Sequence, residues 1–395
     1  MNHIEIAPNI YWVGYVDWDV RNFHGYRTQR GTSYNAYLIV DEKVALIDAV
    51  KLGKGRCLLE HVAEVIDPKK IDYIISNHTE PDHSGEIQKV LDQAPQAVVV
   101  ASEKGKIGLQ KYYPGNWNFQ VMKTGDSINL GKHLLQFINT PMLHWPDSMF
   151  TYLPAQKLLF SMDAFGQHYA TSGRFDTQVD MDVLMAEAKT YYANIIMHLG
   201  SIVSKTLKQA QSLEIETICP SHGVIWTEHR SRILSAYQGW AEFRARPKIL
   251  VIYDSMWHST EQMADVIADA ACVAGAEVKV LKLDVNDLTT LATEVLDAAA
   301  VAVGSPTLNS NMMPTVAAFL TYLKGLKSKG KLGAAFGSYG WSGGAVEQAA
   351  ECLQQAGLEM FGENISCQYR PDEETLRKCR LLGTQLAEQV IKKTK

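Results

Sequence analysis

Residues 77–85 read NHTEPDHSG and follow Ile71–Ser76, a stretch typical of a buried strand. Four potential metal ligands fall within six residues of this segment: His78, Glu80, Asp82 and His83. In an extended segment, the first three of these side chains would point to one side. A lone histidine is usually a core or surface residue, but burying carboxylates with imidazoles, without Lys or Arg, costs free energy unless a cation lies among them. The stretch therefore predicts a metal site at the end of the strand.

This segment resembles the HxHxDH motif of metallo-β-lactamase-like hydrolases, except that Glu80 stands in place of the second histidine. A carboxylate is a harder ligand than an imidazole, so it can bridge two metals or stabilise ferric iron. The resemblance implies further ligands at strand ends, beside small or turn residues. Three positions match: His144 in TPMLHWPD, Asp163 in FSMDAFG and His222 in CPSHGV.

The same resemblance implies how these ligands divide between two metals. Asp163 would be the carboxylate that bridges them. The remaining ligands would form two similar nitrogen and oxygen sites, with His78 and Glu80 on one metal, Asp82 and His83 on the other, and His144 and His222 completing the two. Open positions would remain for a substrate.

The first half of the chain contains many short strands with helical segments between some of them. The strands between Tyr34 and Val44 are adjacent and hairpin-like, which favours a mixed sheet. Helical periodicity runs over Val183–Lys208, which predicts a helix there. A polar helical end then meets Pro247, where we place a domain boundary.

The second half shows a strict alternation of strands and helices from Lys248 onward. A fifth strand is predicted over Glu359–Ser366, before a last helix over Glu373–Lys392. Five strands with intervening helices predict a doubly wound parallel sheet. We therefore divide the chain into residues 1–246 and 247–395.

Three loops at the predicted carboxyl ends of strands in this second half have the composition of a ligand site. The loop DSMWHST (254–260) runs into a helix and offers hydroxyls and free backbone N–H groups to an anion, although an ordinary hydroxyl-capped helix looks the same. The other two read GSPTLNSN (304–311) and GSYGWSGG (337–344), and a glycine-rich loop beside aromatics suits a flat ring. The absence of GxGxxG and GxxxxGK[ST] disfavours a dinucleotide and a nucleoside triphosphate.

Together these loops resemble those with which flavodoxin binds FMN. The first loop contains no Lys or Arg, so neutral donors and the helix dipole would hold the phosphate. The resemblance implies the following FMN-binding residues: Ser255, Met256, Trp257, His258, Ser259, Thr260, Pro306, Thr307, Leu308, Asn309, Ser338, Tyr339, Gly340, Trp341, Ser342, Gly343 and Gly344.

An HxExDH segment in a lactamase-like domain, followed by a flavodoxin-like domain, resembles the flavodiiron proteins, also called A-type flavoproteins or rubredoxin:oxygen oxidoreductases. The resemblance covers nearly the whole chain. It implies an αββα sandwich followed by a flavodoxin-like doubly wound parallel sheet. It also implies two iron ions and one FMN per chain, and an oxidoreductase that reduces dioxygen to water, nitric oxide to nitrous oxide, or both.

The family resemblance extends to partners and to one further residue. Electrons would come from a separate carrier such as rubredoxin, since the chain has neither a CxxC pair nor a nicotinamide fingerprint. The family implies a head-to-tail homodimer, or a tetramer of two such dimers. His24 resembles a histidine beside the family's di-iron pocket, which implies a catalytic role, although a surface histidine is the common alternative.

Composition limits the other possibilities. Lys and Arg total 38 against 43 Asp and Glu, a formal charge of −5, which disfavours nucleic acid and anionic membrane partners. The longest uncharged stretch, residues 298–323, contains two prolines and is not expected to span a membrane. Six scattered cysteines and the absence of a secretory signal predict a cytoplasmic protein.

Two rival functions come from other classes. The lactamase-like fold with zinc and an activated hydroxide would be a hydrolase, but Glu80 and the attached flavin domain argue against it. Alternatively, the chain would be an electron carrier that uses only the FMN, and its first half would be a docking module. The seven residues that match metal ligands would then be accidental.

Overall fold

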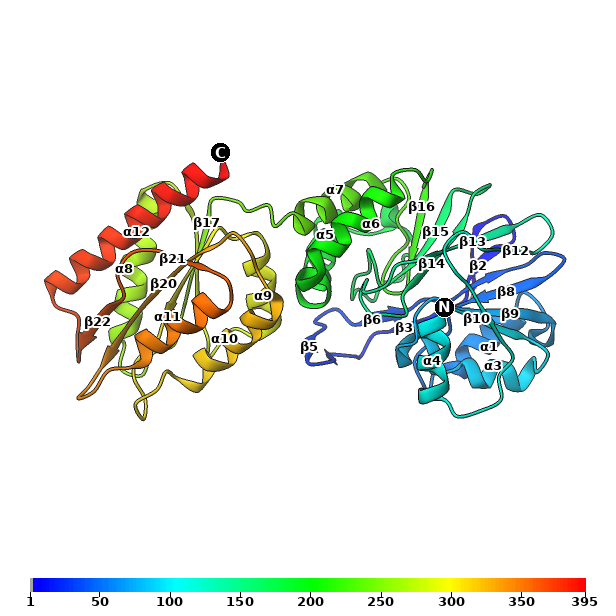
Figure 1. Ribbon diagram of the computed structural model, residues 1–395, viewed down its shortest axis with the longest axis horizontal. Coiled ribbons are helices and arrows are strands. Elements are labelled where there is room, and N and C mark those ends of the chain that lie inside the picture. The colour runs from blue at the N-terminus through cyan, green and yellow to red at the C-terminus, as the bar shows by residue number, and fades with distance from the viewer. Residues whose placement is uncertain (1–2) are drawn as a thin grey trace. The chain divides into compact units, whose positions relative to one another are not determined.

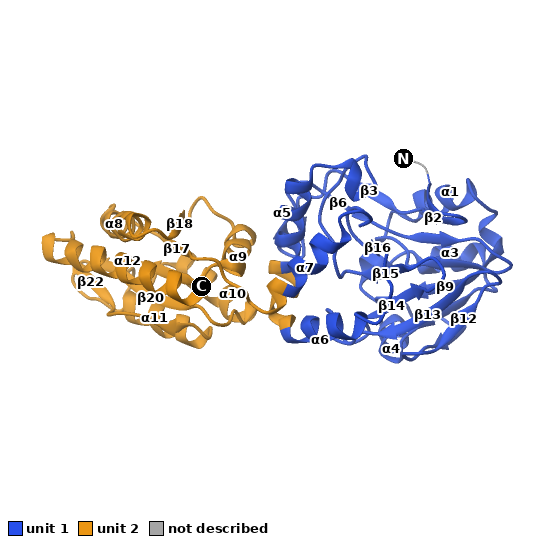
Figure 2. Ribbon diagram, turned by 90° about the horizontal axis from the view of Figure 1, so that it is seen from above, with its two compact units in different colours: residues 1–192, 201–238 blue, residues 193–200, 239–395 orange. Residues whose placement is uncertain are grey.

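The computed structural model of the chain describes residues 3–395, which fall into two compact units (Figures 1 and 2). Unit 1 comprises the residues up to Tyr192 and Ser201–Gln238, and unit 2 comprises Ala193–Gly200 and Gly239–Lys395. No helix in the described part of the chain is long and apolar enough to cross a membrane.

The first sheet of unit 1 has seven strands and is mixed. Its order is β1-β2-β7-β8-β9-β10-β11, antiparallel from β1 to β8 and parallel from β8 to β11. The antiparallel β7–β8 hairpin confirms the expected mixed sheet. The strands are β1 (Ile4–Ala7), β2 (Ile10–Trp12), β7 (Tyr37–Ile39), β8 (Val44–Ile47), β9 (Ile71–Ser76), β10 (Val98–Ala101) and β11 (Phe119–Val121).

The second sheet of unit 1 has five strands in the order β12-β13-β14-β15-β16, antiparallel except for the β15–β16 pair. Two short ribbons, β3–β6 and β4–β5, lie outside both sheets. These strands are β12 (Ser127–Asn129), β13 (Leu134–Asn139), β14 (Met149–Leu153), β15 (Leu158–Met162), β16 (Thr217–Pro220), β3 (Tyr15–Asp17), β6 (Thr32–Tyr34), β4 (Asn22–Phe23) and β5 (Tyr26–Arg27).

Alternation along the strands builds the two cores of unit 1. Ile47 and Ile75 pack with Phe160 in a core between the two sheets, whereas Leu46 and Ile74 belong to the core beneath α1 and α3. The helices α5, α6 and α7 lie beside the second sheet (Figure 1). The unit is therefore an αββα sandwich. Its helices are α1 (Gly55–Ala63), α2 (Pro81–Ser84), α3 (Ile87–Gln93), α4 (Glu103–Tyr112), α5 (Met181–Tyr191), α6 (Gly200–Ala210) and α7 (Arg230–Ala241).

The prediction of a single helix over Val183–Lys208 is wrong. After α5, a π-helical turn (Tyr192–Ile196) and a 3₁₀ turn (Met197–Leu199) precede α6. Residues 191–197 are all buried, and a regular helix with one apolar face would expose some of them to solvent. The change in helix type lets consecutive side chains reach apolar surroundings.

Unit 2 contains an all-parallel sheet in the order β18-β17-β19-β20, extended by β21 and β22, which both pair with β20. Val251 belongs to the core with α8 and α12, and its neighbour Ile252 to the core with α9, α10 and α11, so helices cover both faces. This confirms a flavodoxin-like doubly wound sheet. Its elements are β17 (Lys248–Tyr253), α8 (Ser259–Val273), β18 (Glu277–Lys282), α9 (Leu288–Asp297), β19 (Ala300–Gly304), α10 (Pro314–Leu326), β20 (Leu332–Tyr339), α11 (Ala345–Gln355), β21 (Glu359–Met360), β22 (Ile365–Gln368) and α12 (Glu373–Thr394).

The fifth strand of unit 2 differs from the one expected over Glu359–Ser366. The pairing with β20 is interrupted between β21 and β22, where Gly362 adopts a φ of +73°. A glycine takes up this left-handed conformation at little cost, and it turns the chain out of the sheet for a few residues.

Candidate functional site

A cluster of carboxylates and imidazoles is buried in unit 1, where several strands end. Asp163 directly follows β15, and His222 lies two residues after β16. The structure brings together all seven side chains for which the sequence predicts metal binding. Their ligand atoms form two groups, each within 4.8 Å: His78, Glu80, His144 and Asp163 in the first, and Asp82, His83 and His222 in the second.

Asp163 faces both groups with a different oxygen. Its Oδ2 lies 3.0 Å from His144 Nε2 and 3.5 Å from His78 Nε2. Its Oδ1 lies 3.1 Å from His83 Nε2 and 3.3 Å from His222 Nε2. This is the geometry that a carboxylate needs to bridge two metal ions.

The segment that carries Asp82 and His83 is helical, so the expectation of an extended segment is wrong. Pro81 begins the short helix α2, as its fixed φ favours at the first helical position. Within this turn, Asp82 Oδ2 lies 3.1 Å from His222 Nε2 and 3.3 Å from His83 Nε2. The helical turn thus lets two consecutive residues reach the same group, which an extended strand would not allow.

The second group contains buried polar atoms without a well-aligned hydrogen bond. Both oxygens of Asp82 and both ring nitrogens of His83 lack such a partner among the described residues. Two of these atoms, Asp82 Oδ2 and His83 Nε2, nevertheless have neighbours in the cluster at 3.1–3.3 Å. Ligand atoms that surround a common cation lie close together but point at the cation and not at one another, which is the arrangement seen here. The site therefore fits a metal ion.

Electrostatics support the same conclusion. Burial lowers the pKa of His78, but the carboxylates of Asp147 and Glu80 outweigh burial and hold this pKa well above its ordinary value. Burial also opposes charge on His222, yet Asp163 and Asp82 raise its pKa to about 10. Without metal these imidazoles hold protons, and metal binding would displace protons from the same nitrogens.

Outer hydrogen bonds orient the imidazoles. His78 Nδ1 lies 3.0 Å from Asp147 Oδ2, which also accepts a 2.7 Å hydrogen bond from the backbone N–H of Thr79. His222 Nδ1 lies 2.6 Å from the carbonyl oxygen of Ser33. Each contact fixes a ring so that Nε2 faces the cluster. Sequence reasoning missed the role of Asp147, although its position three residues after His144 was a usable signal.

His24 lies at the edge of the cluster, in the turn between β4 and β5, with its side chain about half exposed. Its Nε2 lies 3.0 Å from Glu80 Oε1. The hydrogen bond that His24 donates to Glu80 raises the pKa of His24, against the opposing effect of partial burial. His24 therefore contacts a predicted ligand from the solvent side.

Two further residues of the cluster were missed. Tyr191, the last residue of α5, donates a 2.8 Å hydrogen bond to Asp163 Oδ1. The buried ring of His168 lies 5.1 Å from that of His222, and its Nδ1 lies 2.9 Å from Thr32 Oγ1. No local pattern marks Tyr191, because its partner is 28 residues away.

A second site lies in unit 2 at the carboxyl ends of β17, β19 and β20. All three predicted loops line a cavity of about 650 Å³ there, with Ser310 of the second loop among the lining residues. Tyr369 and Arg370 also line it, and the sequence did not suggest these two. Twelve of the seventeen predicted FMN residues line it. The other five lie outside the lining: Ser255, His258, Thr260, Gly343 and Gly344.

The start of α8 offers an anion cradle beside this cavity. Its first backbone N–H groups have no partner within the helix. Ser255 Oγ is buried without a hydrogen-bond partner in the described chain, whereas Thr260 Oγ1 lies 3.0 Å from Ser338 Oγ. A Cβ atom on Gly337 would lie 1.9 Å from the carbonyl oxygen of Ser305, so only glycine lets these two loops approach. The site fits a phosphorylated flat ring such as FMN.

Comparisons with known proteins cover both units. A family model described as "ODP family beta lactamase" matches residues 32–223, and one described as "Flavodoxin" matches residues 251–383. A protein named nitric oxide reductase from Moorella thermoacetica is 46% identical, over 98% of each chain. The anaerobic nitric oxide reductase flavorubredoxin of Escherichia coli is 39% identical, over 98% of this chain and 82% of its own.

Solved structures agree with these relatives. The rubredoxin oxygen:oxidoreductase of Desulfovibrio gigas matches with a TM-score of 0.97 at 37% identity, over 99% of each chain. The flavodiiron protein of Giardia intestinalis matches with a TM-score of 0.96 at 37% identity, over 99% of this chain and 97% of its own. The similarity therefore spans both units and not one of them alone.

Proposed function

The chain belongs to the flavodiiron proteins, and from that premise we propose that it reduces dioxygen to water, nitric oxide to nitrous oxide, or both. It is an oxidoreductase of a family that carries FMN and a di-iron centre. The observation that carries the proposal is Asp163, whose two oxygens face two separate groups of ligands.

The seven clustered residues would hold two irons. His78, Glu80 and His144 would bind one iron, the second group would bind the other, and Asp163 would lie between them. When bound, the two irons together can supply two electrons and the FMN another two, which matches the four that reduction of dioxygen to two waters requires.

The chain's own residues hold and orient this centre. Asp147 and the Ser33 carbonyl fix the rings of His78 and His222, and the Tyr191 hydroxyl donates to Asp163. We propose that His24, hydrogen-bonded to Glu80 and half exposed, holds a proton at Nε2 where solvent can replace it. This residue would serve the proton demand of the reaction without binding metal.

We propose rubredoxin or a similar small redox protein as the electron donor. The six cysteines form no disulfide in the structure, and no two form a CxxC pair, so the sequence offers no rubredoxin-type iron site. Free thiols also support a cytoplasmic location. Rapid oxidation of NADH by the pure protein, without a carrier, would contradict an external donor.

We further propose a head-to-tail homodimer, or a tetramer of two such dimers, in which FMN of one chain serves the metals of the other. Closed two-fold symmetry would create two such junctions at once. The test mixes a metal-free variant (His78→Ala with Asp163→Ala) with a variant of weakened FMN binding (Ser255→Ala with Thr260→Ala) from which the FMN has been removed beforehand. Heterodimers should regain part of the activity. Inactive heterodimers with intact folds and remaining cofactors would place electron transfer within one chain.

Turnover of both gases by one preparation tests the function. Protein loaded with iron and FMN should consume dioxygen or nitric oxide with reduced rubredoxin as donor. The same chain loaded with zinc should consume neither, because zinc has no redox chemistry. Gas turnover with zinc alone would disprove the redox assignment, and metal analysis of the native protein should give two irons per chain with little zinc.

A further inference from the structure

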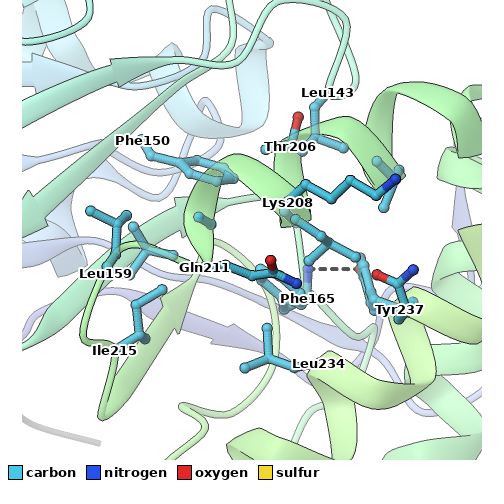
Figure 3. Close-up of a pocket in the computed structure, with 16 residues that line it drawn as sticks. Leu143, Phe150, Leu159, Phe165, Thr206, Lys208, Gln211, Ile215, Leu234 and Tyr237 are labelled. Carbon is cyan, nitrogen blue, oxygen red and sulfur yellow. Dashed lines mark hydrogen bonds between the residues drawn. The ribbon is translucent and has the colours of Figure 1, made fainter.

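A second concavity of unit 1 lies apart from both sites described above. It occupies about 370 Å³ between the second sheet and helices α6 and α7 (Figure 3). Phe150 of β14 and Leu159 of β15 line it from the sheet, and Val203 and Leu207 of α6 and Leu234 of α7 from the helices. All of its lining residues belong to unit 1.

The interior of this cavity is apolar. Phe150, Leu159 and Val203 are each at most 3% exposed. Tyr237 brings a hydroxyl to the wall, but this oxygen accepts a 2.7 Å hydrogen bond from the backbone N–H of Phe165 (Figure 3). The charged and amide groups of Lys208 and Gln211 belong to exposed residues at the mouth. Thr206 and Gln238 also line the cavity but are only partly buried, so Tyr237 supplies the only polar side chain among the fully buried lining residues of the described chain.

The cavity shares two loops with the metal cluster. Leu143, which lines it, directly precedes His144, and Ala164 and Phe165 directly follow Asp163. Because these residues are joined to His144 and Asp163 through the backbone, they adjoin two of the predicted ligands. The two loops therefore contribute residues both to the lining of the cavity and to the cluster.

We infer that this cavity binds small apolar gas molecules and passes them to the metal cluster; the inference rests on the proposed function and extends it to substrate access. Enclosed apolar cavities stay dry and bind apolar guests such as xenon, and the buried part of this cavity has the same kind of lining. Dioxygen and nitric oxide are small and weakly hydrated, so an apolar space beside the metals raises their local concentration. A longer apolar ligand, such as an acyl chain, is the competing occupant.

Xenon is the probe for the cavity itself. Crystals of the holoenzyme under xenon pressure should show xenon between Phe150, Leu159 and Leu207, with no need for turnover. Absence of xenon would overturn the inference, and so would an elongated molecule that co-purifies in the cavity. Because xenon binding needs no chemistry, loss of gas turnover with xenon still bound would count against the proposed function and not against the cavity.

Variants test whether the cavity serves catalysis. Leu207→Trp fills it from α6, and the matched control Lys205→Trp places the same side chain on an exposed part of that helix outside the cavity. We expect Leu207→Trp to lose xenon and to lower kcat/KM for the gas by about threefold or more, while kcat at saturating gas and reduction of FMN by the donor stay unchanged.

A second, milder variant guards against misfolding. Ala210→Leu also lies on the lining and adds less volume. It should lower kcat/KM in the same direction by a smaller factor, and Lys205→Trp should behave like the parent chain. If the filled variants lose xenon but keep the parent's kcat/KM, the cavity does not deliver substrate and the inference fails.

Discussion

The metal cluster of unit 1 and the flavin cavity of unit 2 are built in opposite ways. The cluster joins charged side chains from loops spread over residues 78–222, and Asp163 at its centre is only 2% exposed. The flavin cavity is lined by backbone, hydroxyls and aromatic rings, and Trp257 and Trp341 at its rim are 85% and 91% exposed. One site is buried charge and the other is largely neutral and open to solvent.

This difference determines how each site responds to damage. In the cluster, removing one group leaves others buried without a partner, which is costly. In the flavin cavity, water can replace a lost neutral donor, so each contact contributes modestly. We therefore expect a single substitution in the cluster of unit 1 to abolish metal binding, and a single substitution in the flavin cavity of unit 2 to weaken FMN binding only in part.

The largest effect is expected for Asp163→Ala. Losing both oxygens removes the group that faces both sets of ligands, so iron content should fall from two per chain to nearly zero, and gas turnover should be abolished. FMN should stay bound, because the flavin cavity lies in the other unit. Iron analysis and flavin absorbance of the same sample measure both.

Asp182→Ala is the matched control for this experiment. Asp182 lies in the first turn of α5 with a 93% exposed side chain, and its loss should leave iron, FMN and turnover unchanged. Retention of two irons and of turnover in Asp163→Ala would contradict the contrast between the two sites, since the cluster would then tolerate the loss of its central group.

An intermediate effect is expected for Asp147→Ala. Asp147 does not face the cluster itself but holds the ring of His78 through Nδ1. Residues that orient a metal-binding histidine typically contribute about 10- to 100-fold in metal affinity or activity. Asp147→Asn, which keeps an acceptor oxygen, should lose less than Asp147→Ala in an iron-binding titration. Equal losses in both variants would indicate that charge and not ring orientation is what Asp147 supplies.

The sequence predicted those parts of the molecule whose signal is local. The segment at 77–85 holds four clustered ligands next to one another, and strict strand–helix alternation predicted the parallel sheet of unit 2. His144 and His222 required the family resemblance, because each lies alone in its loop. Both types of signal depend on neighbours in the chain or on a known pattern.

The features that the sequence did not predict depend on contacts between distant residues. Tyr191 reaches Asp163 only because α5 ends beside β15, and no periodicity in either segment indicates this. The break between α5 and α6 follows from burial of a whole turn on all sides, which residue type alone does not specify. Pro81 was a readable signal for α2, but the ligand spacing was interpreted as an extended strand instead.

The smallest effect is expected for Ser255→Ala in the flavin site. Its buried hydroxyl has no partner in the described chain and lies beside the start of α8, where an FMN phosphate would accept its hydrogen bond. A neutral hydrogen bond contributes about 0.5–1.5 kcal/mol, so the Kd for FMN should rise about twofold to twelvefold. Thr260→Ala should add to this effect through Ser338, which the Thr260 hydroxyl contacts.

Flavin fluorescence titration measures each Kd, and the iron content should stay at two per chain. Ser366→Ala, on an exposed position of β22, serves as the control. A complete loss of FMN from Ser255→Ala would show that this site, like the metal cluster, loses its ligand when one side chain is removed. An unchanged Kd in the Ser255 and Thr260 double variant would move the phosphate away from α8.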